Sequence, residues 1–141
     1  GDSPVVDGEY CKRSPVSYLR NAKGKVRLHI ATGITDGHNG SVPISHSLLA
    51  FNEVAEEKDR IGSEEIAFMT KESRLPDALT RAAPDPTFGA KQPIFRRSSA
   101  TATVTIFDGG HEIIQPAAIA WMQGLYQAGG SKDQEDSKTG E

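Results

Sequence analysis

The stretch that decides the fold runs from residue 101 to residue 112 and reads TATVTIFDGGHE. Its first seven residues are rich in β-branched side chains, which is typical of a strand. The two glycines and the histidine that follow indicate a turn. We therefore expect a strand over residues 101–107 that leads into a loop carrying His111.

A second strand and loop occur earlier, where residues 26–43 read VRLHIATGITDGHNGSVP. The branched residues predict a strand over residues 26–34, followed by a glycine-rich loop that carries Asp36. Pro43 then starts an amphipathic helix that we expect to reach about Lys58. Its apolar residues recur at helical spacing: Ile44, Leu48, Phe51 and Val54.

The remaining segments predict shorter elements. We expect irregular structure over residues 1–13 and helices over residues 14–22, from Ser63 onward, and over residues 116–127, with residues 76–83 compatible with one more. Residues 84–99 are expected to form an irregular excursion, because this stretch contains four turn-favouring residues. These are Pro84, Pro86, Gly89 and Pro93.

The order of strand, loop, helix, strand, loop and helix indicates an α/β fold with a parallel sheet and flanking helices. Two strands cannot form such a sheet alone, so we expect the fold to be incomplete as an isolated chain. In open α/β sheets, ligands collect at the carboxyl ends of the strands. Asp36 and His111 each follow a strand and are expected at that same edge.

An acid and a histidine at one edge suggest two members of a serine-hydrolase triad. The acid would hold the imidazole in its useful tautomer, and the imidazole would move the proton of a serine. Gly109 and Gly110 would let the two loops approach closely. The nucleophile motif Gly-x-Ser-x-Gly occurs nowhere in the 141 residues, so the serine is expected on residues outside this chain.

Residues 32–47, which read TGITDGHNGSVPISHS, resemble the acid loop of prolyl-oligopeptidase-like α/β-hydrolases. Residues 104–112 resemble the histidine loop of the same enzymes. The resemblance implies that Asp36 is the catalytic acid and His111 the catalytic base. It further implies that residues 1–127 are the C-terminal part of an α/β-hydrolase domain. The polar and charged composition after this segment predicts a disordered tail over residues 128–141.

The resemblance implies hydrolysis of an ester or peptide bond in a small-molecule or peptide substrate, with no metal ion or organic cofactor. The expected partner is a missing N-terminal hydrolase part that carries the nucleophilic serine and the oxyanion hole. The isolated chain is expected to be inactive. A rival hypothesis is a non-catalytic interaction half-domain that docks through an exposed sheet edge, with Asp36 and His111 as relics.

Other reactive side chains fit less well. His38 is a rival base, but its neighbours suggest a role in shaping the loop, while His29 is interpreted as a strand residue. Glu112 is expected in solvent or in a salt bridge within the loop. Cys11 lies in an irregular opening segment and is a poor nucleophile. The spacing of Asp36 and the histidines does not match that of a metal site.

Composition limits the kinds of partner and structure that the chain is expected to have. The net charge of −3 argues against nucleic acid or an anionic membrane as the main partner. No apolar run approaches the roughly 18 residues that a membrane-spanning helix needs. The single cysteine excludes an internal disulfide framework and identifies no compartment.

Overall fold

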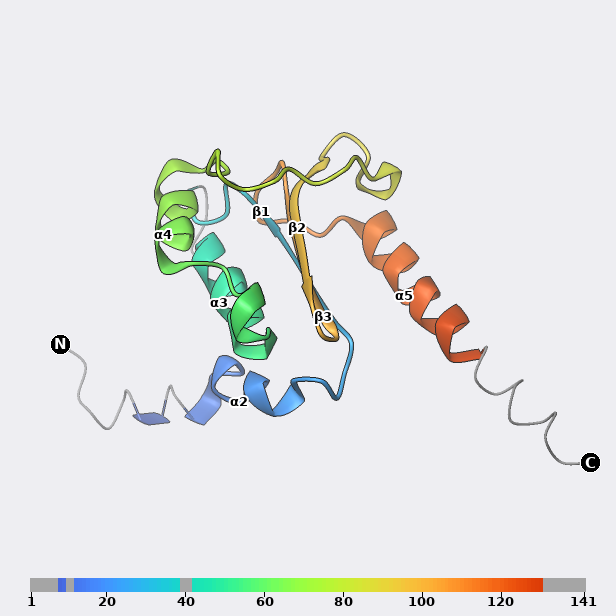
Figure 1. Ribbon diagram of the computed structural model, residues 1–141. Coiled ribbons are helices and arrows are strands. Elements are labelled where there is room, and N and C mark those ends of the chain that lie inside the picture. Colours follow the sequence, from blue (N-terminus) through green and yellow to red (C-terminus); the bar gives the residue numbers. More distant parts are fainter. Residues whose placement is uncertain (1–7, 10–11, 39–41, 131–141) are drawn as a thin grey trace, which may run out of the picture.

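The computed structural model describes residues 8–9, 12–38 and 42–130. Its α-helices are α2 (Val16–Leu19), α3 (Ile44–Val54), α4 (Ser63–Glu72) and α5 (Gln115–Gly130). Its short 3₁₀ helices are η1 (Arg20–Ala22), η2 (Glu57–Asp59) and η3 (Pro86–Phe88), and its strands are β1 (Leu28–Gly33), β2 (Pro93–Ser99) and β3 (Ala102–Phe107). Figure 1 shows the sheet lying between α3 and α4 on one side and α5 on the other.

The three strands form one sheet in the order β1-β3-β2. β1 and β3 are parallel, with a register that runs from Leu28 opposite Ala102 to Gly33 opposite Phe107. This confirms the expected α/β class and the parallel pairing of the two predicted strands. The prediction of a wholly parallel sheet is wrong, because β2 pairs antiparallel to β3 and the sheet is mixed.

The prediction of an irregular excursion over residues 84–99 is also wrong in its second half, which is strand β2. Pro93 is the first residue of β2, and a proline is tolerated at the start of an edge strand. β2 turns directly into β3 through Ala100 and Thr101, and Ala100 has a positive φ of 49°. Nothing in the sequence marks this turn, because such hairpin positions usually carry glycine or asparagine.

The helices largely follow their predicted positions. α3 ends at Val54 because Ala55 is extended, with φ −74° and ψ 152°, so the helix stops short of Lys58. Residues 76–83 form a turn and no helix. α5 continues to Gly130, so the prediction of a tail is wrong for residues 128–130, and the rest of the predicted tail lies outside the described residues. Among the described helices, none has both the length and the apolar character to cross a bilayer.

The main core lies between the sheet and the α3–α4 layer. Val104 and Ile106 of β3, two positions apart, both point toward this layer and are completely buried. They pack with apolar residues that α3 presents on one face. The α3 residues are Ile44, Leu48, Phe51 and Val54.

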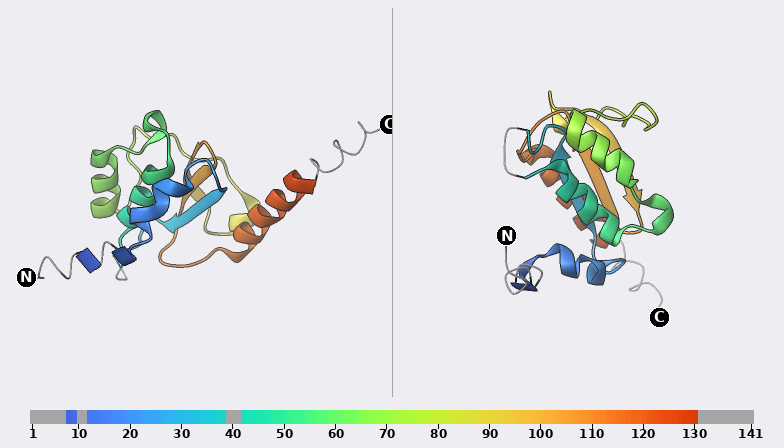
Figure 2. Two further views of the ribbon diagram at one scale, coloured as in Figure 1. Left: turned by 90° about the horizontal axis from the view of Figure 1, so that it is seen from below. Right: turned by 90° about the vertical axis from the view of Figure 1, so that its left-hand side faces the viewer.

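A smaller core lies on the opposite face of the sheet. It contains Phe107 of β3, Phe88 of η3 and Ala117 of α5. Farther along α5, the Trp121 ring packs on the His29 ring of β1 at 5.6 Å between centroids. Figure 2 shows α5 leaving the sheet at an angle, so this helix covers only part of the face.

Candidate active site

The parallel pairing of β1 and β3 brings the two predicted site residues together. Asp36 follows the carboxyl end of β1, and His111 follows that of β3. His111 Nδ1 lies 3.2 Å from Asp36 Oδ1, although the two residues are 75 positions apart in sequence. The expected meeting of these side chains at one sheet edge is therefore present in the structure.

The carboxylate of Asp36 is buried, with only 8% of the residue exposed. Its second oxygen, Oδ2, accepts a hydrogen bond of 2.8 Å from Thr32 Oγ1. Its backbone carbonyl accepts from Ile44 N at the start of α3. Each carboxylate oxygen thus has its own donor, and the side chain is fixed between β1 and α3. Sequence reasoning missed Thr32, since nothing distinguishes it from the other threonines on the strands.

His111 is held at one end of its ring and open at the other. A carboxylate only accepts hydrogen bonds, so His111 donates from Nδ1. A neutral imidazole carries hydrogen on only one of its two nitrogens, so in the neutral form of His111 Nε2 carries none. Its side chain is 71% exposed. Within the described part of the chain, no hydrogen bond involves Nε2. This nitrogen is available to accept a proton from a group that approaches from outside.

Close contact of the two loops depends on glycine at the end of β1. A Cβ on Gly33 would lie 2.2 Å from the Gly109 carbonyl oxygen and 2.3 Å from that of Gly110. The same Gly109 oxygen accepts from Thr35 N at 3.0 Å and from Thr35 Oγ1 at 2.8 Å. The two loops do lie close together, but Gly109 and Gly110 are not the glycines that this contact requires: a Cβ on Gly109 would meet Phe107 of its own segment at 2.7 Å, and one on Gly110 would reach only Thr35 Oγ1, at 3.4 Å. Gly33 was missed, and its signal was a glycine within a strand pattern.

The acid loop has a second requirement for glycine at Gly37. This residue has φ +89°, a conformation that side chains rarely adopt. A Cβ there would also meet Pro43 Cα at 2.6 Å. Gly37 therefore lies directly against Pro43, the residue that precedes α3.

Glu112 ties the histidine loop to the segment before β2. It forms a salt bridge with Lys91 and accepts from Gly110 N at 3.2 Å. The hydrogen bond from Lys91, followed by that from Gly110, lowers the pKa of the Glu112 carboxyl. Glu112 does form a salt bridge, but with Lys91 on another segment and not within its own loop, and this partner could not be inferred from sequence.

Among the described residues, no hydrogen bond joins the other histidines to Asp36 or His111. His38 Nε2 contacts the carbonyl oxygen of Thr70 in α4 at 2.8 Å, which fits the expected loop-shaping role. His46 is exposed in the first turn of α3. In the described residues, no three His, Cys, Asp or Glu side chains gather as a metal site would require.

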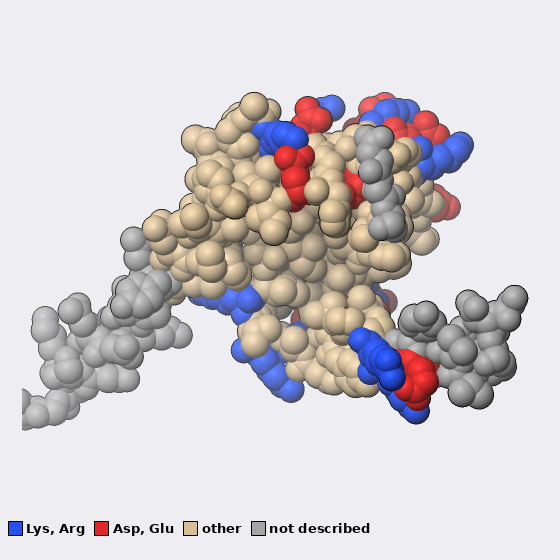
Figure 3. Space-filling view, turned by 180° about the vertical axis from the view of Figure 1, so that it is seen from behind, with Lys and Arg blue, Asp and Glu red and all other residues tan. Residues whose placement is uncertain are grey.

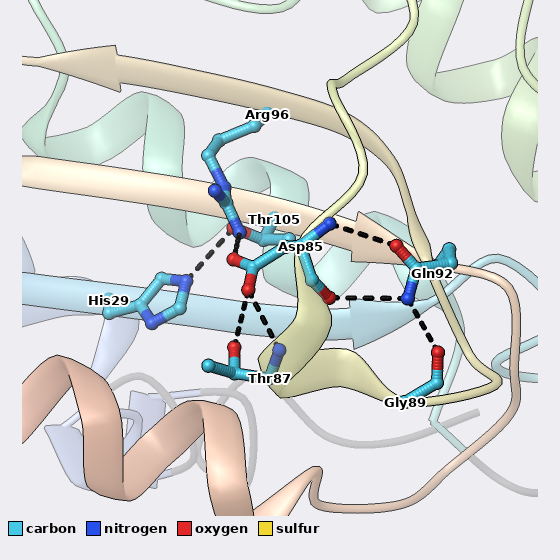
Figure 4. A network of polar contacts seen from close by, with 7 residues as sticks. All are labelled: His29, Asp85, Thr87, Gly89, Gln92, Arg96 and Thr105. Carbon is cyan, nitrogen blue, oxygen red and sulfur yellow. Dashed lines mark hydrogen bonds and ion pairs between the residues drawn. The ribbon is translucent and has the colours of Figure 1, made fainter.

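His29 belongs to a polar network on the α5 side of the sheet (Figure 4). Its Nε2 lies 2.9 Å from Thr105 Oγ1, which also accepts from Arg96 Nε at 3.1 Å. Arg96 in turn donates to Asp85 Oδ2 at 2.8 Å. Burial of the ring and the nearby Arg96 lower the pKa of His29, and Asp85 opposes them. Nothing in the residues around His29 predicts that this strand histidine shares a threonine hydroxyl with an arginine.

A pocket of about 620 Å³ opens beside the acid–base pair. It is bounded by β1, by α3 and by the chain that follows His111. Figure 3 shows the side of the molecule on which β1 lies, where a largely uncharged surface separates charged margins. The lining residues are Ala31, Asp36, Val42, Ser47, His111, Glu112, Ile113 and Gln115.

The arrangement can orient and deprotonate an external hydroxyl, but it contains no nucleophile on a strand-to-helix turn among the described residues. Comparison of the chain with protein-family models, with curated proteins and with solved structures gave no match.

Proposed function

We propose that this chain is the acid- and base-bearing part of a serine hydrolase of the α/β-hydrolase type. Asp36 orients His111, and the nucleophilic serine lies on a part of the protein outside these 141 residues. One observation carries the proposal: the 3.2 Å contact between Asp36 Oδ1 and His111 Nδ1. This contact lies at the carboxyl ends of parallel strands, where α/β proteins bind their ligands.

The contact defines the role of each group. Asp36 fixes the tautomer with hydrogen on Nδ1 and stabilises the imidazolium that forms during reaction. His111 Nε2 accepts the proton of the serine hydroxyl as the serine attacks a carbonyl carbon. The same nitrogen then returns the proton to the leaving alcohol or amine. The acyl-enzyme is hydrolysed by water through the same base.

The proposed substrates are esters or peptides, because both react through this acyl transfer. The chemistry needs no metal ion or organic cofactor. The open pocket beside His111 leaves room for a scissile carbonyl and for the serine. Without the serine, the 141-residue chain alone is expected to hydrolyse neither class.

Nitrogen NMR of the histidine rings tests the geometry in the chain itself. Neutral His111 is expected to carry its hydrogen on Nδ1, because Asp36 accepts from that atom. His38 is expected to carry hydrogen on Nε2, because the Thr70 carbonyl accepts there. In Asp36→Asn, His111 should shift toward the Nε2-protonated form while His38 stays unchanged. An unchanged His111 tautomer in this variant would remove the proposed role of Asp36.

Turnover tests the chemistry in the complete protein that contains this chain. His111→Ala is expected to lower kcat by about 10⁴-fold or more, because the serine loses its base. His46→Ala is the matched control, since His46 is an exposed histidine near the same end of the fold. Near-normal hydrolysis by His111→Ala would contradict the proposal. A folded complete protein that is inactive on every ester and peptide tested, and unlabelled by a fluorophosphonate, would favour the non-catalytic half-domain.

A further inference from the structure

The two edges of the sheet differ in how well they are protected against pairing. β2 starts with Pro93 and has an irregular register between Pro93 and Phe95. It also carries Arg96 and Arg97 in succession. Proline, bulges and charged side chains are the features that keep an edge strand from pairing with another strand. These features of β2 disfavour the pairing of a further strand at this edge.

The β1 edge has none of these features. Leu28–Gly33 contains no proline and no Asp, Glu, Lys or Arg, and its register with β3 is continuous. The backbone amides of Leu28 and Ile34 donate toward β3, at 3.0 Å each. Because hydrogen-bonding direction alternates along a strand, the amides and carbonyls of His29 and Ala31 face the open edge. Gly33 does not belong to this open stretch, because it is buried and its carbonyl already accepts from Asp36 N at 3.2 Å. Among the described residues, β1 thus presents the unpaired backbone groups of His29 and Ala31.

Apolar side chains border this open stretch on the α5 side. A second pocket of about 230 Å³ lies between β1 and α5 and is lined by Ala31, Trp121 and Met122 among others. Ile113 is 80% exposed and Met122 is 55% exposed. Such exposed apolar groups beside an unpaired edge are typical of a protein interaction site.

The apolar border is continuous with the site of the acid–base pair. The pocket beside α5 and the pocket beside His111 share Ala31, Glu112 and Ile113 in their linings. A strand added at the β1 edge would therefore lie next to Asp36 and His111. A strand added at β2 would be separated from β1 by two further strands, at about 4.8 Å per step.

We propose that the β1 edge is the docking surface for a β-strand of the nucleophile-bearing part, added parallel to β1. The added strand bonds to the backbone of His29 and Ala31, and an apolar segment of the same part covers Ile113 and Met122. The parallel direction places the carboxyl end of the new strand beside His111. The identity of this partner rests on the proposed function, whereas the docking surface itself rests on the two edges.

Hydrogen exchange tests the docking directly. In the 141-residue chain, the amides of His29 and Ala31 should exchange quickly, while those of Ile30 and Thr32 are protected by β3. When the chain is part of the complete protein, or is co-expressed with the segment encoded upstream of it, all four should be protected. Fast exchange of His29 and Ala31 in both forms would overturn the proposal.

Two variants of the docking surface sharpen the test with the co-expressed upstream segment. Ala31→Pro removes a donor from the open edge without removing a hydrogen bond to β3, so the chain should fold and fail to associate. Met122→Lys should weaken association by about tenfold or more. Gln123→Lys is the matched control, because Gln123 is the exposed neighbour of Met122 and lines neither pocket. Equal association of Met122→Lys and Gln123→Lys would remove α5 from the surface.

If Ala31→Pro does not fold, Ala31→Lys places a charge at the same edge, and retained association of a folded variant would count against docking there. Light scattering separates the other occupant, a second copy of this chain. A dimer of the isolated chain with protected Ala31 would overturn the proposed partner.

Fluorophosphonate labelling distinguishes failure of docking from failure of the proposed function. Protection of Ala31 without a His111-dependent adduct would retain the docking surface and reject the serine hydrolase. A His111-dependent adduct without protection of Ala31 would retain the serine hydrolase and reject the docking surface.

Discussion

Toward α3 and α4 the sheet meets a layer of fully buried aliphatic and aromatic side chains, whereas toward α5 it presents a histidine, threonines and an arginine. On the first face, Leu48 and Phe51 of α3 have no exposed surface. On the second face, Thr105 is equally buried but connects His29 to Arg96 through its hydroxyl (Figure 4).

The difference shows that burial has been achieved in two ways within one small sheet. Apolar burial on the α3 side stabilises the fold without reference to charge, and it anchors the helix that closes the Asp36 loop. Hydrogen bonds and an ion pair on the α5 side make that face dependent on pH and salt. Substitutions on the two faces should therefore differ in size and in their response to conditions.

The largest effect is expected on the α3 side, for Phe51→Ala. Truncating a fully buried phenylalanine removes its transfer free energy and leaves a cavity, which costs about 3–5 kcal/mol. Phe68→Ala in α4 is the control, because Phe68 is only partly buried and packs under Arg74. Urea unfolding measures both losses. A loss for Phe51→Ala no greater than that for Phe68→Ala would mean that the α3 face is not the main core.

A smaller loss is expected on the α5 side, for Thr105→Val. The change keeps the shape but leaves Arg96 Nε and His29 Nε2 without their shared partner, which costs about 1–3 kcal/mol. Thr103→Val on the same strand is the control, since its hydroxyl pairs with Ser98 near solvent. If the two valine variants are equally stable, the network of Figure 4 contributes nothing through Thr105.

The response to pH should belong to the α5 side. His29 has its pKa lowered below 6.5 in the folded protein, first by burial and then by Arg96. Below pH 6.5 the unfolded chain therefore binds a proton that the folded chain does not, and stability falls as the pH decreases toward the folded pKa. His29→Gln should flatten the free energy of unfolding in this window. A slope unchanged by His29→Gln would assign the dependence to other groups.

The smallest effect is expected for the ion pair of Asp85 and Arg96. Both side chains are partly exposed, at 23% and 38%, so Asp85→Asn should cost about 1 kcal/mol or less. Asparagine can still accept from Thr87, as Asp85 Oδ1 does now, and only the charge is lost. Thermal unfolding at low and high salt should show a difference that shrinks with added salt. A difference that grows with salt would exclude an electrostatic origin.

The parts of the fold that sequence predicts are those with one dominant period. β1, β3 and α3 follow from branched residues and from apolar spacing. β2 could not be predicted, because Pro93, Arg96 and Arg97 resemble a loop and because the turn at Ala100 lacks glycine. Its pairing depends on β3, which is information that a single segment does not contain.

The residues of the candidate site also fall into those that the sequence predicts and those that it does not. Asp36 and His111 follow the ends of predictable strands, so their meeting follows from the parallel pairing of those strands. Thr32 and Lys91 become visible only when the chain is folded, because their partners are distant in sequence or in a loop. Gly33 lies between these cases, since its position suggests a close approach without saying to what.

The β2–β3 hairpin is also expected to fold before the contact between Asp36 and His111 forms. Its turn spans only Ala100 and Thr101. A hairpin with such local contacts forms within about 1–10 μs. Asp36 and His111 are 75 positions apart, and closing so long a loop is slower and costs more chain entropy. During synthesis β1 leaves the ribosome long before β3 exists, so for that interval the edge of β1 that pairs with β3 is open. The acid–base pair is expected to be the last part of the molecule to assemble.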